Sequence, residues 1–588
     1  MAGGYYSQGT TPSPGMLNGQ LASAAGRSSL GPSTPTPSMS SRVTDFVEKN
    51  KRALLLGVGA SVLVAGSAVG YLYYTRPGAA TGDALRMTSS QLAAMPVERR
   101  KEIAGDLKTK GNKAYSAKKY KEAIEIYSKA IECDEQAVYY SNRAACYTNL
   151  SKNEDVISDC TSALRLDPTY VKALNRRGQA REAVGGEEEL FQALCDFTAG
   201  AIIDGFQNES MAKAVDRVMK QLASEKGVKI MATREPRLPS PTFIKAYMEA
   251  FRPRDRPTKP AQPSQGDETL FLAFDALDAR NYAHAFTLFN EAIEQGISSN
   301  ELKGRALNMS GTFKFIIGDS QGALEALDES TKLWPAYTQT WVKKASVYME
   351  LSRPEQAFES FEEAIKIDGK DPDIYYHRGQ VYFITGQFNA AIDEYKRSTE
   401  LDGRFVFSQI QLAVAMYKNE QAEKALHLFK RIIREFRNES PEVYNYYGEI
   451  LLDRGEFASA LENLDKAIAL EKAKATPSTP VNVLPMVNKA LCLYQSKQAL
   501  GEAEAICREA LELDPSCDIA VATIGQLLLQ QNKVHEAVDA FAKSAEIART
   551  EPELVNALAY ESATKAQLDF IDKYPEYAHK LGLAQSRM

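Results

Sequence analysis

The hydrophobic and polar positions of this chain repeat with a long period after residue 100. In LKTKGNKAYSAKKYKEAIEIYSKAIECD, residues 107–134, a small residue at Gly111 is followed by Tyr120 and then by Ala123 and Ala130, seven residues apart. The small position recurs in steps of 34 residues at Gly311, Ala345, Gly379 and Ala413, and it continues at Gly448, Ala490 and Gly525. Self-similarity at a fixed period indicates a repeat architecture rather than one globular core.

Each repeat is predicted to be a pair of antiparallel helices. Small residues are needed where the two helices touch, because their backbones approach closely only without bulky side chains between them. Alanine pairs mark the second helices at Ala285/Ala292, Ala357/Ala364, Ala460/Ala467 and Ala503/Ala510. Proline, which cannot continue a helix, ends units at Pro168, Pro335, Pro372 and Pro515. The pattern is that of tetratricopeptide repeats, about three in 104–204 and about eight in 267–550, with a closing helical stretch at 553–585.

One stretch before the repeats is long and apolar enough to cross a membrane. Residues 1–52 form a tail, most of it rich in Ser, Thr, Pro and Gly, which we expect to be disordered. Residues 53–75 contain no charge across 23 positions, and this predicts a single transmembrane helix. We expect residues 76–103 to be a linker to the repeats.

Two features disagree on which side of the membrane the repeats face. Lys49, Lys51 and Arg52 precede the span, and the positive-inside rule would keep that flank in the cytosol and send the repeats across. The seven cysteines are scattered, without a C-x-x-C pair, mostly at apolar helical positions. Buried free thiols of this kind are typical of a reducing compartment. We give the cysteines more weight and expect the repeats in the cytosol.

The repeats divide into two arrays. Residues 104–231 are predicted to form an N-terminal domain of about three repeats, and residues 267–588 a C-terminal array of about eight repeats with closing helices. Between them, residues 232–266 contain Pro236, Pro239, Pro241, Pro253, Pro257, Pro260 and Pro263. Helix is not expected to persist through that density of proline, so this stretch is interpreted as a linker. The predicted fold class is all-α: a superhelical solenoid in two arrays, preceded by one transmembrane helix.

A set of polar residues on the first helices of the N-terminal domain suits an acidic peptide. First helices line the concave face of such a solenoid. Lys108 and Asn112 are four residues apart and share a helical face, as do Lys172 and Arg176, and Asn142 comes from the repeat between them. Lysine supplies a point charge, arginine a bidentate fork and asparagine a partner for peptide backbone. We predict that these five residues bind a terminal carboxylate together with an acidic side chain.

These five positions resemble the dicarboxylate clamp of chaperone-binding repeat proteins, whose pattern is Lys-x-x-x-Asn, then Asn, then Lys-x-x-x-Arg. The resemblance implies that the domain binds the acidic Glu-Glu-Val-Asp tails of the Hsp70 and Hsp90 heat-shock chaperones. The whole order of tail, span, three-repeat clamp, linker and eight further repeats is similar to the fungal form of the Tom-seventy family, the large tetratricopeptide receptor of the mitochondrial outer-membrane translocase.

That family resemblance implies a location and a set of partners. It implies a single-pass protein of the mitochondrial outer membrane with its repeats in the cytosol. Such a receptor takes chaperone-delivered precursors, notably of the carrier type, and hands them to the translocation pore, so other outer-membrane translocase subunits are expected partners. One departure is the insertion at 185–189 in the third repeat, which is predicted to lengthen a turn and leave the five clamp residues in place.

The second array is expected to hold the precursor, but its contact residues are harder to name. Aromatic residues near the starts of first helices are candidates for apolar contacts: Tyr376, Phe405, Phe407, Tyr446 and Tyr447. Other aromatics stand four residues before the small position, where core packing is the better interpretation: Trp341, Tyr375 and Tyr444.

Composition and motifs argue against catalysis and against nucleic-acid binding. The apolar content of 44% and charged content of 25% are those of an ordinary globular protein, and a net charge of −6 does not suit phosphate binding. The five histidines are widely spaced, without a second ligand at metal-binding distance in sequence: His284, His377, His427, His535 and His579. No phosphate-binding glycine loop or G-x-S-x-G motif occurs, so we expect a binding protein without a catalytic, cofactor or metal site.

Two other functions remain open on the sequence alone. The chain could be a membrane-tethered co-chaperone on another organelle, such as the endoplasmic reticulum or a plastid envelope. It could also be a scaffold for a stable complex, which predicts a hydrophobic, permanently occupied surface. The second array favours the receptor, because a simple tether needs no second groove.

Overall fold

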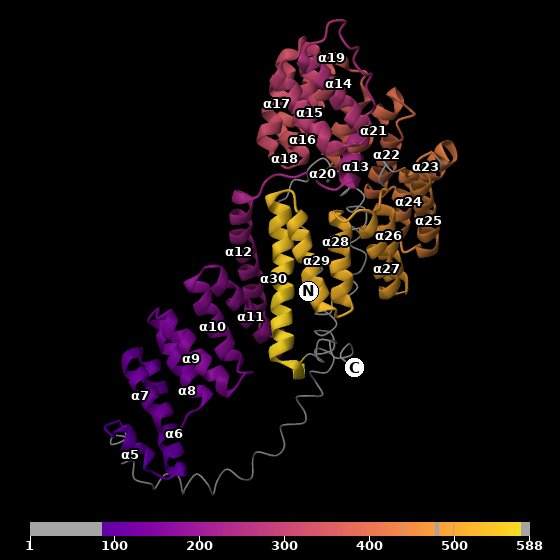
Figure 1. Cartoon of the computed structure of the whole chain (residues 1–588). Helices are drawn as coiled ribbons and strands as arrows, with labels where there is room; N and C mark the ends of the chain where they lie inside the picture. Colours follow the sequence, from indigo (N-terminus) through magenta and orange to yellow (C-terminus); the bar gives the residue numbers. More distant parts are fainter. Residues whose placement is uncertain (1–84, 438, 477–480, 498, 578–588) are drawn as a thin grey trace. The chain divides into compact units, whose positions relative to one another are not determined.

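The computed structural model describes residues 85–437, 439–476, 481–497 and 499–577, and their regular structure is helical (Figure 1). The predicted tail and transmembrane helix at 53–75 lie outside these residues. Among the helices that are described, none combines the length and apolar character that a membrane span needs. The all-helical fold class predicted from the repeats is confirmed.

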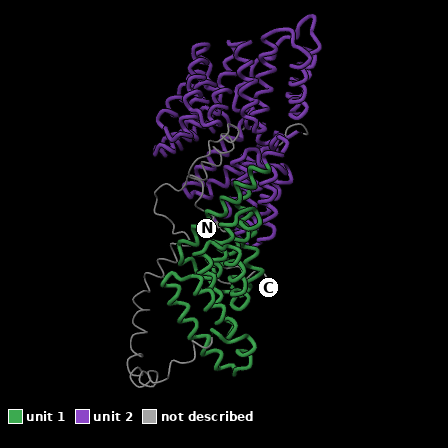
Figure 2. The backbone as a smooth tube through the Cα atoms, turned by 90° about the vertical axis from the view of Figure 1, so that its left-hand side faces the viewer, with its two compact units in different colours: residues 1–6, 32–230, 558–588 green, residues 7–31, 231–557 purple. Residues whose placement is uncertain are grey.

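The described chain forms two compact units, coloured separately in Figure 2. Unit 1 contains described residues 85–230 and 558–577, and unit 2 contains described residues between 231 and 557. The expectation that 267–588 forms one C-terminal array is therefore corrected at its end. Phe570 and Tyr574 are buried with Leu174 in a core of unit 1, and this packing assigns the last helical residues to the first array.

Unit 1 consists of three antiparallel helix pairs with additional helices at either end. Its helices are α5 (Ser89–Ala93), α6 (Val97–Ser116), α7 (Tyr120–Cys133), α8 (Ala137–Asn149), α9 (Asn153–Leu166), α10 (Val171–Val184), α11 (Glu187–Ile203) and α12 (Glu209–Thr233), with the second part of α30 (Glu551–Lys573). The pairs are α6 with α7, α8 with α9, and α10 with α11. Helix also begins inside the predicted linker 76–103, where Thr88 caps α5 and Leu92 is fully buried. The linker expectation missed this because the segment lies before the first recognisable repeat.

Unit 2 consists, in its described residues, of eight consecutive pairs and one short helix before them. Its helices are α13 (Pro241–Glu249), α14 (Gln265–Asp278), α15 (Tyr282–Gln295), α16 (Asn300–Ile316), α17 (Ser320–Leu333), α18 (Thr338–Glu350), α19 (Pro354–Asp368), α20 (Pro372–Ile384), α21 (Phe388–Leu401), α22 (Val406–Lys418), α23 (Ala422–Phe436), α24 (Pro441–Asp453), α25 (Phe457–Lys474), α26 (Leu484–Lys497), α27 (Leu500–Leu513), α28 (Asp518–Gln530) and α29 (Val534–Ile547), followed by the start of α30.

Where the small position is glycine, it lies against a large side chain of the second helix. A methyl group at Gly379 would lie 2.8 Å from a ring carbon of Tyr395, a separation that carbon atoms do not tolerate. The same contact recurs between Gly111 and Tyr127, Gly178 and Phe197, Gly311 and Leu327, Gly448 and Leu464, and Gly525 and Phe541. The absence of a side chain on the first helix thus makes room for the buried group of the second.

In several repeats the residue just before the small position forms an ion pair with a second helix that packs against it. Arg143 donates to the buried Asp159 at 2.6 Å, and Arg378 donates to Glu394 at 2.9 Å. Arg177 pairs with Asp196 in the same way, within one repeat. Lys344 and Lys489 instead pair with Asp328 and Asp465, which lie on the second helix of the preceding repeat. We call this residue the pairing position. It has a structural role in these repeats, because its charge is neutralised by an acidic residue of an adjacent second helix.

The proline-rich stretch 232–266 is more ordered than the linker predicted for it. Ser240 caps α13 by accepting a hydrogen bond from the Phe243 backbone N–H at 3.1 Å, and Pro241 occupies the first turn, where its missing N–H costs nothing. Tyr247 and Phe251 are buried in the core of unit 2. We call residues 240–256 the inner segment. Its prolines stand at the ends of α13 rather than within it, which is why helix survives there.

The contact at the small position generates a test of this packing. We predict that Gly379→Ala destabilises unit 2 by about 1–3 kcal/mol, because the new methyl group must displace the fully buried Tyr395 ring. Gly501→Ala is the matched control, since nothing lies within 4 Å of a methyl group there and alanine favours helix by about 1 kcal/mol. Thermal unfolding followed by circular dichroism should show a lower midpoint for the first variant only; equal midpoints would contradict the packing argument.

Candidate functional site

The predicted clamp residues come from the first helices of the three pairs of unit 1. Lys108 and Asn112 lie on α6, Asn142 on α8, and Lys172 and Arg176 on α10. The Asn142 amide donates to Asn112 Oδ1 at 3.3 Å, so those two side chains meet. Lys172 is exposed and Lys108 half-buried, and neither has a hydrogen bond or ion pair with the described residues.

Arg176 is held beside this asparagine pair by its neighbour Ser141. Its Nη1 donates to the Ser141 carbonyl at 3.0 Å and to the Ser141 hydroxyl at 2.5 Å. Ser141 is completely buried, so it fixes the guanidinium group without neutralising it. Arg176 therefore keeps donors for an anionic ligand.

The adjacent arginine shows how differently the two positions are used. Arg177 stands at the pairing position and donates to both oxygens of the buried Asp196, at 2.6 and 2.9 Å. Arg143, next to Asn142, is paired with Asp159 in the same way. The cations of the clamp lack such partners, so the face that includes Lys108, Lys172 and Arg176 keeps uncompensated positive charge.

Tyr127 contacts the predicted clamp and was not singled out from the sequence. Its hydroxyl donates to Asn112 Oδ1 at 2.7 Å, which leaves the Asn112 amide hydrogens directed elsewhere. Burial raises the pKa of Tyr127 to about 12, so the hydroxyl stays a donor at neutral pH. The repeat pattern could have indicated Tyr127, because it is the large residue that faces the small position Gly111 across the first helix pair.

The insertion in the third repeat does not lengthen a turn. Helix α10 ends at Val184 and α11 begins at Glu187, so only Gly185 and Gly186 connect them, with φ of 76° and 85°. Positive φ is easy for glycine, and this permits the short connection. The three acidic residues 187–189 instead form the first turn of α11, where negative charge is favourable at a helix N-terminus.

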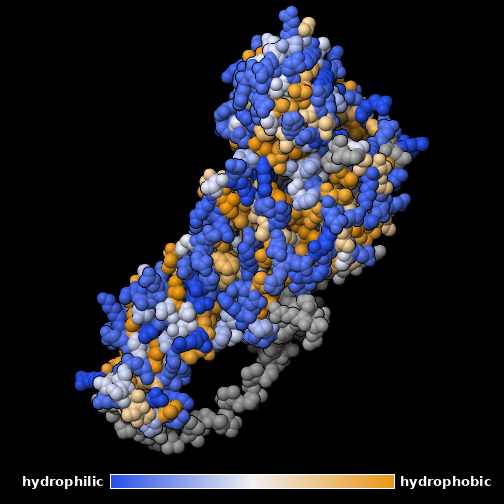
Figure 3. Space-filling model, viewed as in Figure 1, coloured by the Kyte–Doolittle hydropathy of each residue, from blue (hydrophilic) through white to orange (hydrophobic). Residues whose placement is uncertain are grey.

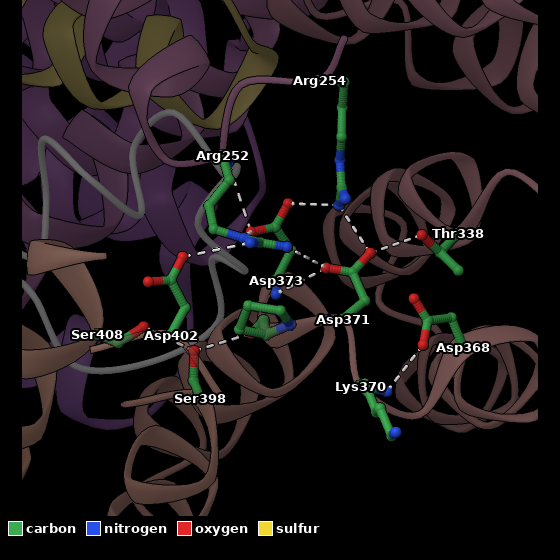
Figure 4. A network of polar contacts seen from close by, with 11 residues as sticks. Arg252, Arg254, Thr338, Asp368, Lys370, Asp371, Asp373, Ser398, Asp402 and Ser408 are labelled. Carbon is green, nitrogen blue, oxygen red and sulfur yellow. Dashed lines mark hydrogen bonds and ion pairs between the residues drawn. The ribbon is translucent and has the colours of Figure 1, made fainter. Parts of the chain in front are cut away.

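In unit 2 the inner segment is tied to the repeats by a buried charge network (Figure 4). Arg252 donates to Asp371 at 3.0 Å, to Asp373 at 3.1 Å and to Asp402 at 3.2 Å. Arg254 contacts Asp371 at 2.7 Å and Asp373 at 2.8 Å. The side chains of Asp371 and Asp373 are only 1% and 0% exposed. Two arginines thus lie across two buried carboxylates, and removing either arginine would leave the two carboxylates to share one cation.

The apolar part of the inner segment covers two further repeats. Phe251 stacks on His377, with ring centroids 4.2 Å apart, and lies 5.2 Å from Lys343 Nζ. Lys343 donates to Asn308 and Thr312, both at 2.8 Å. Burial lowers the pKa of Lys343 to about 7 and that of His377 to about 3.

In both units, residues on the inner surface occupy the same position relative to the small residue of their repeat. Lys343 and His377 stand two residues before their small positions, Ala345 and Gly379, as Asn142 and Arg176 do in unit 1. We call this the inner position. In unit 1 it holds the predicted clamp residues Asn142 and Arg176, and in unit 2 Lys343 and His377 face Phe251 of the inner segment.

The aromatic residues of unit 2 are placed differently from the sequence prediction. Four of the five groove candidates are buried in the core: Tyr376, Phe405, Tyr446 and Tyr447. These four side chains do not offer a broad apolar surface to a ligand, because residues of neighbouring repeats pack over them, as Phe429 packs on Tyr447. Phe407 is half-buried and lines a pocket. The three aromatics assigned to the core are only half-buried: Trp341, Tyr375 and Tyr444. Two of them, Trp341 and Tyr375, pack against the edge of the core and donate a hydrogen bond to a backbone carbonyl of the preceding loop.

The visible surface does not suggest a permanently covered apolar face. Hydrophilic residues predominate on the face in Figure 3, with hydrophobic residues between the elements. Among the described residues, the large hydrophobics that are well exposed are scattered, such as Val97, Val184, Val228 and Leu272. Single exposed hydrophobics are ordinary and need no partner. This surface does not favour the scaffold alternative.

The repeats match known families. Residues 345–384 match the family described as TPR repeat, residues 372–405 match a tetratricopeptide repeat family, and residues 410–480 and 450–516 match another tetratricopeptide repeat family. These matches all lie in unit 2 and agree with its helix pairs.

Relatives extend over most of the chain. The mitochondrial import receptor subunit TOM70 of Mus musculus is 30% identical over 523 residues, which cover 84% of this chain and 82% of that protein. The subunit of the same name from Homo sapiens is 29% identical over 496 residues, covering 79% and 80%. Among solved structures, the crystal structure of the yeast Tom70 matches with a TM-score of 0.52 and 29% identity, covering 82% of this chain and 99% of that one.

The buried Lys343 generates a prediction about pH. Its pKa in the folded protein, about 7, lies below the ordinary value of 10.5, so between these values the unfolded chain binds more protons. Stability must therefore rise with pH over that window, by at most about 1.4 kcal/mol per pH unit, and be flat below it. In Lys343→Met this contribution should be absent, whereas Lys466→Met, on an exposed residue, should keep the wild-type slope. The measurement is the midpoint of thermal unfolding at pH values from about 6 to about 9. If the midpoints of wild type and Lys343→Met change equally with pH, the proposed contribution of Lys343 is excluded.

Proposed function

This chain belongs to the family of the mitochondrial import receptor subunit TOM70, and from that premise we propose that unit 1 captures cytosolic chaperones while unit 2 receives the precursor proteins they bring. The observation that best supports this proposal is the set of unneutralised polar side chains on the first helices of unit 1. Their neighbours at the pairing position are neutralised by buried aspartates, so the remaining cations serve a ligand rather than the fold.

The proposed ligand of unit 1 is the acidic C-terminal tail of an Hsp70 or Hsp90 chaperone. A terminal aspartate offers two carboxylates, and Lys108, Lys172 and Arg176 supply three cationic groups. Asn112 and Asn142, already in contact, suit the peptide backbone between them. Charge-assisted hydrogen bonds to a flexible tail give affinity on the order of micromolar, so that release stays fast.

The proposed role of unit 2 is to hold the precursor, of which the mitochondrial carriers are the expected class. A chaperone bound at unit 1 raises the local concentration of its cargo at unit 2, because the second binding step becomes intramolecular. Binding, without a chemical step, accounts for both roles. The precursor then passes to the translocation pore through other subunits of the outer-membrane translocase.

We further propose that residues 53–75 anchor the chain in the mitochondrial outer membrane, with both units in the cytosol. The seven cysteines support this orientation. Each is a buried free thiol, and burial raises the pKa of Cys146 to about 11 and that of Cys160 to about 12, so both stay unreactive. The co-chaperone alternative shares unit 1 but gives the eight pairs of unit 2 no ligand.

The clamp is tested by titrating the full chain in detergent with a fluorescent peptide that ends in Glu-Glu-Val-Asp. We predict saturable binding that Arg176→Ala weakens by about 1.5–3 kcal/mol, because charge-assisted hydrogen bonds are lost. Arg165→Ala, which removes an exposed arginine paired with Glu135, should leave the affinity unchanged. A peptide without the terminal aspartate should bind weakly. Equal affinity of Arg176→Ala and wild type would remove Arg176 from the clamp.

The anchor is tested by placing charge in the apolar stretch. We predict that the double variant Val62→Arg, Val64→Arg is released from mitochondrial membranes by alkaline carbonate, since each arginine costs about 2.5–3.5 kcal/mol at the centre of a span. Wild type should stay in the membrane pellet, as should a variant with leucine at the same two positions. A pelleted arginine variant would show that another segment holds the chain.

A further inference from the structure

Unit 2 contains a small pocket beside the inner segment. Its cavity volume is about 30 Å³, and its walls come from α13, α22, α24, α25, the start of α26 and the chain just before it. Three carboxylate side chains line it, Glu249, Glu442 and Glu471, together with the aromatic rings of Phe407 and Tyr446. A space of this size admits one or two water-sized groups and excludes a whole aromatic or leucine side chain.

One carboxylate oxygen in this pocket has no partner. Glu471 is only 2% exposed. Its Oε2 accepts hydrogen bonds from Lys245 at 3.3 Å and from the Asn482 backbone N–H at 3.2 Å, whereas its buried Oε1 accepts none. A buried acceptor without a donor is costly, so the pocket suits a donor that the described residues do not supply.

The charges around the pocket do not balance. Glu249 forms a long ion pair with Arg280, at 3.9 Å, and Glu442 accepts a hydrogen bond from the neutral Ser440. With Lys245 on Glu471, three carboxylates share two cations. Burial, with the nearby carboxylates Glu442 and Glu471, raises the pKa of Glu249 to about 7, against the opposing effect of Lys245 and Arg280. A further cation in the pocket would relieve this repulsion.

The surroundings favour an organic cation over a metal ion. Within the described residues, no group of three or more potential ligands is arranged to hold a metal. Phe407 and Tyr446 add aromatic surface, which attracts ammonium groups through the ring quadrupole. An ammonium group is about the size of a water molecule, whereas the planar guanidinium group of arginine is larger than this space.

We propose that this pocket binds the ammonium group of a lysine side chain from the polypeptide held by unit 2. The inference rests on the proposed function, since it names a chemical feature of the precursor that unit 2 receives. The ammonium group donates to Glu471 Oε1 and is flanked by Glu249 and Glu442. Because Glu249 belongs to α13, the inner segment is one wall of the site and not only a covering of the repeats.

The test compares two fluorescein-labelled peptides with the full chain in detergent, by fluorescence anisotropy. Both are amphipathic helices of leucine and alanine with three lysines on the polar face, and in one of them the lysines are acetylated. Acetylation keeps the length and the apolar face but removes the charge. We expect the lysine peptide to bind about tenfold more tightly than the acetylated one.

Variants locate the preference at the pocket. In Glu442→Gln and Glu471→Gln the ratio of the two affinities should fall to about one, whereas Glu435→Gln, an exposed residue of α23, should keep the wild-type ratio. Glu442 is half-buried, so its variant supports the test if the buried Glu471→Gln does not fold. If the wild-type chain binds both peptides equally, the lysine site is overturned and the receptor function still stands. The same conclusion follows if Glu442→Gln keeps the wild-type ratio of the two affinities. A wild-type chain that binds neither peptide overturns both.

Discussion

The structure depends on the close approach of two helices within each repeat. This approach requires a residue without a bulky side chain on the first helix and a large buried group on the second, as at Gly379 and Tyr395. Once that contact is fixed, the rotation of the first helix is fixed as well. The residue one position earlier then reaches the second helix and forms an ion pair, and the residue two positions earlier faces the inner surface. Fold and binding surface therefore follow from one packing constraint.

The same register produces two kinds of inner surface. In unit 1 the inner positions hold Asn142 and Arg176, whose contacts with Asn112 and Ser141 orient them without neutralising charge. In unit 2 the inner position of Lys343 is packed under Phe251. Burial lowers the pKa of this lysine far from its ordinary value, so it has lost the property that makes Arg176 useful to an anionic ligand. Whether a basic residue at this register binds a partner is decided by what the rest of the chain places over it.

Sequence could predict the parts of the molecule that depend on local spacing. The period, the helix pairs and the residues available to a clamp all follow from distances of a few residues along the chain. The inner segment could not be found in this way, because Arg252 meets Asp371 and Asp373, which lie more than a hundred residues later. The density of proline was misleading for a related reason: it shows where helix must stop, but not what the intervening residues contact. The return of residues after 557 to unit 1 rests on Phe570 and Tyr574, two aromatics outside the repeat pattern.

The inner segment fills part of the inner surface of unit 2, while most of the aromatics that the sequence indicated are buried between neighbouring repeats. Repeats that curve around a ligand leave polar backbone ends and side chains facing inward, and these must find partners when no ligand is present. The inner segment supplies such partners through Arg252, Arg254 and the backbone N–H of Thr242, which donates to Asp514 at 3.3 Å. It leaves Glu471 Oε1 without a partner among the described residues. Selectivity in unit 2 is then expected to come from the few groups its own chain leaves unsatisfied, because only there does a ligand gain interactions that the free protein lacks.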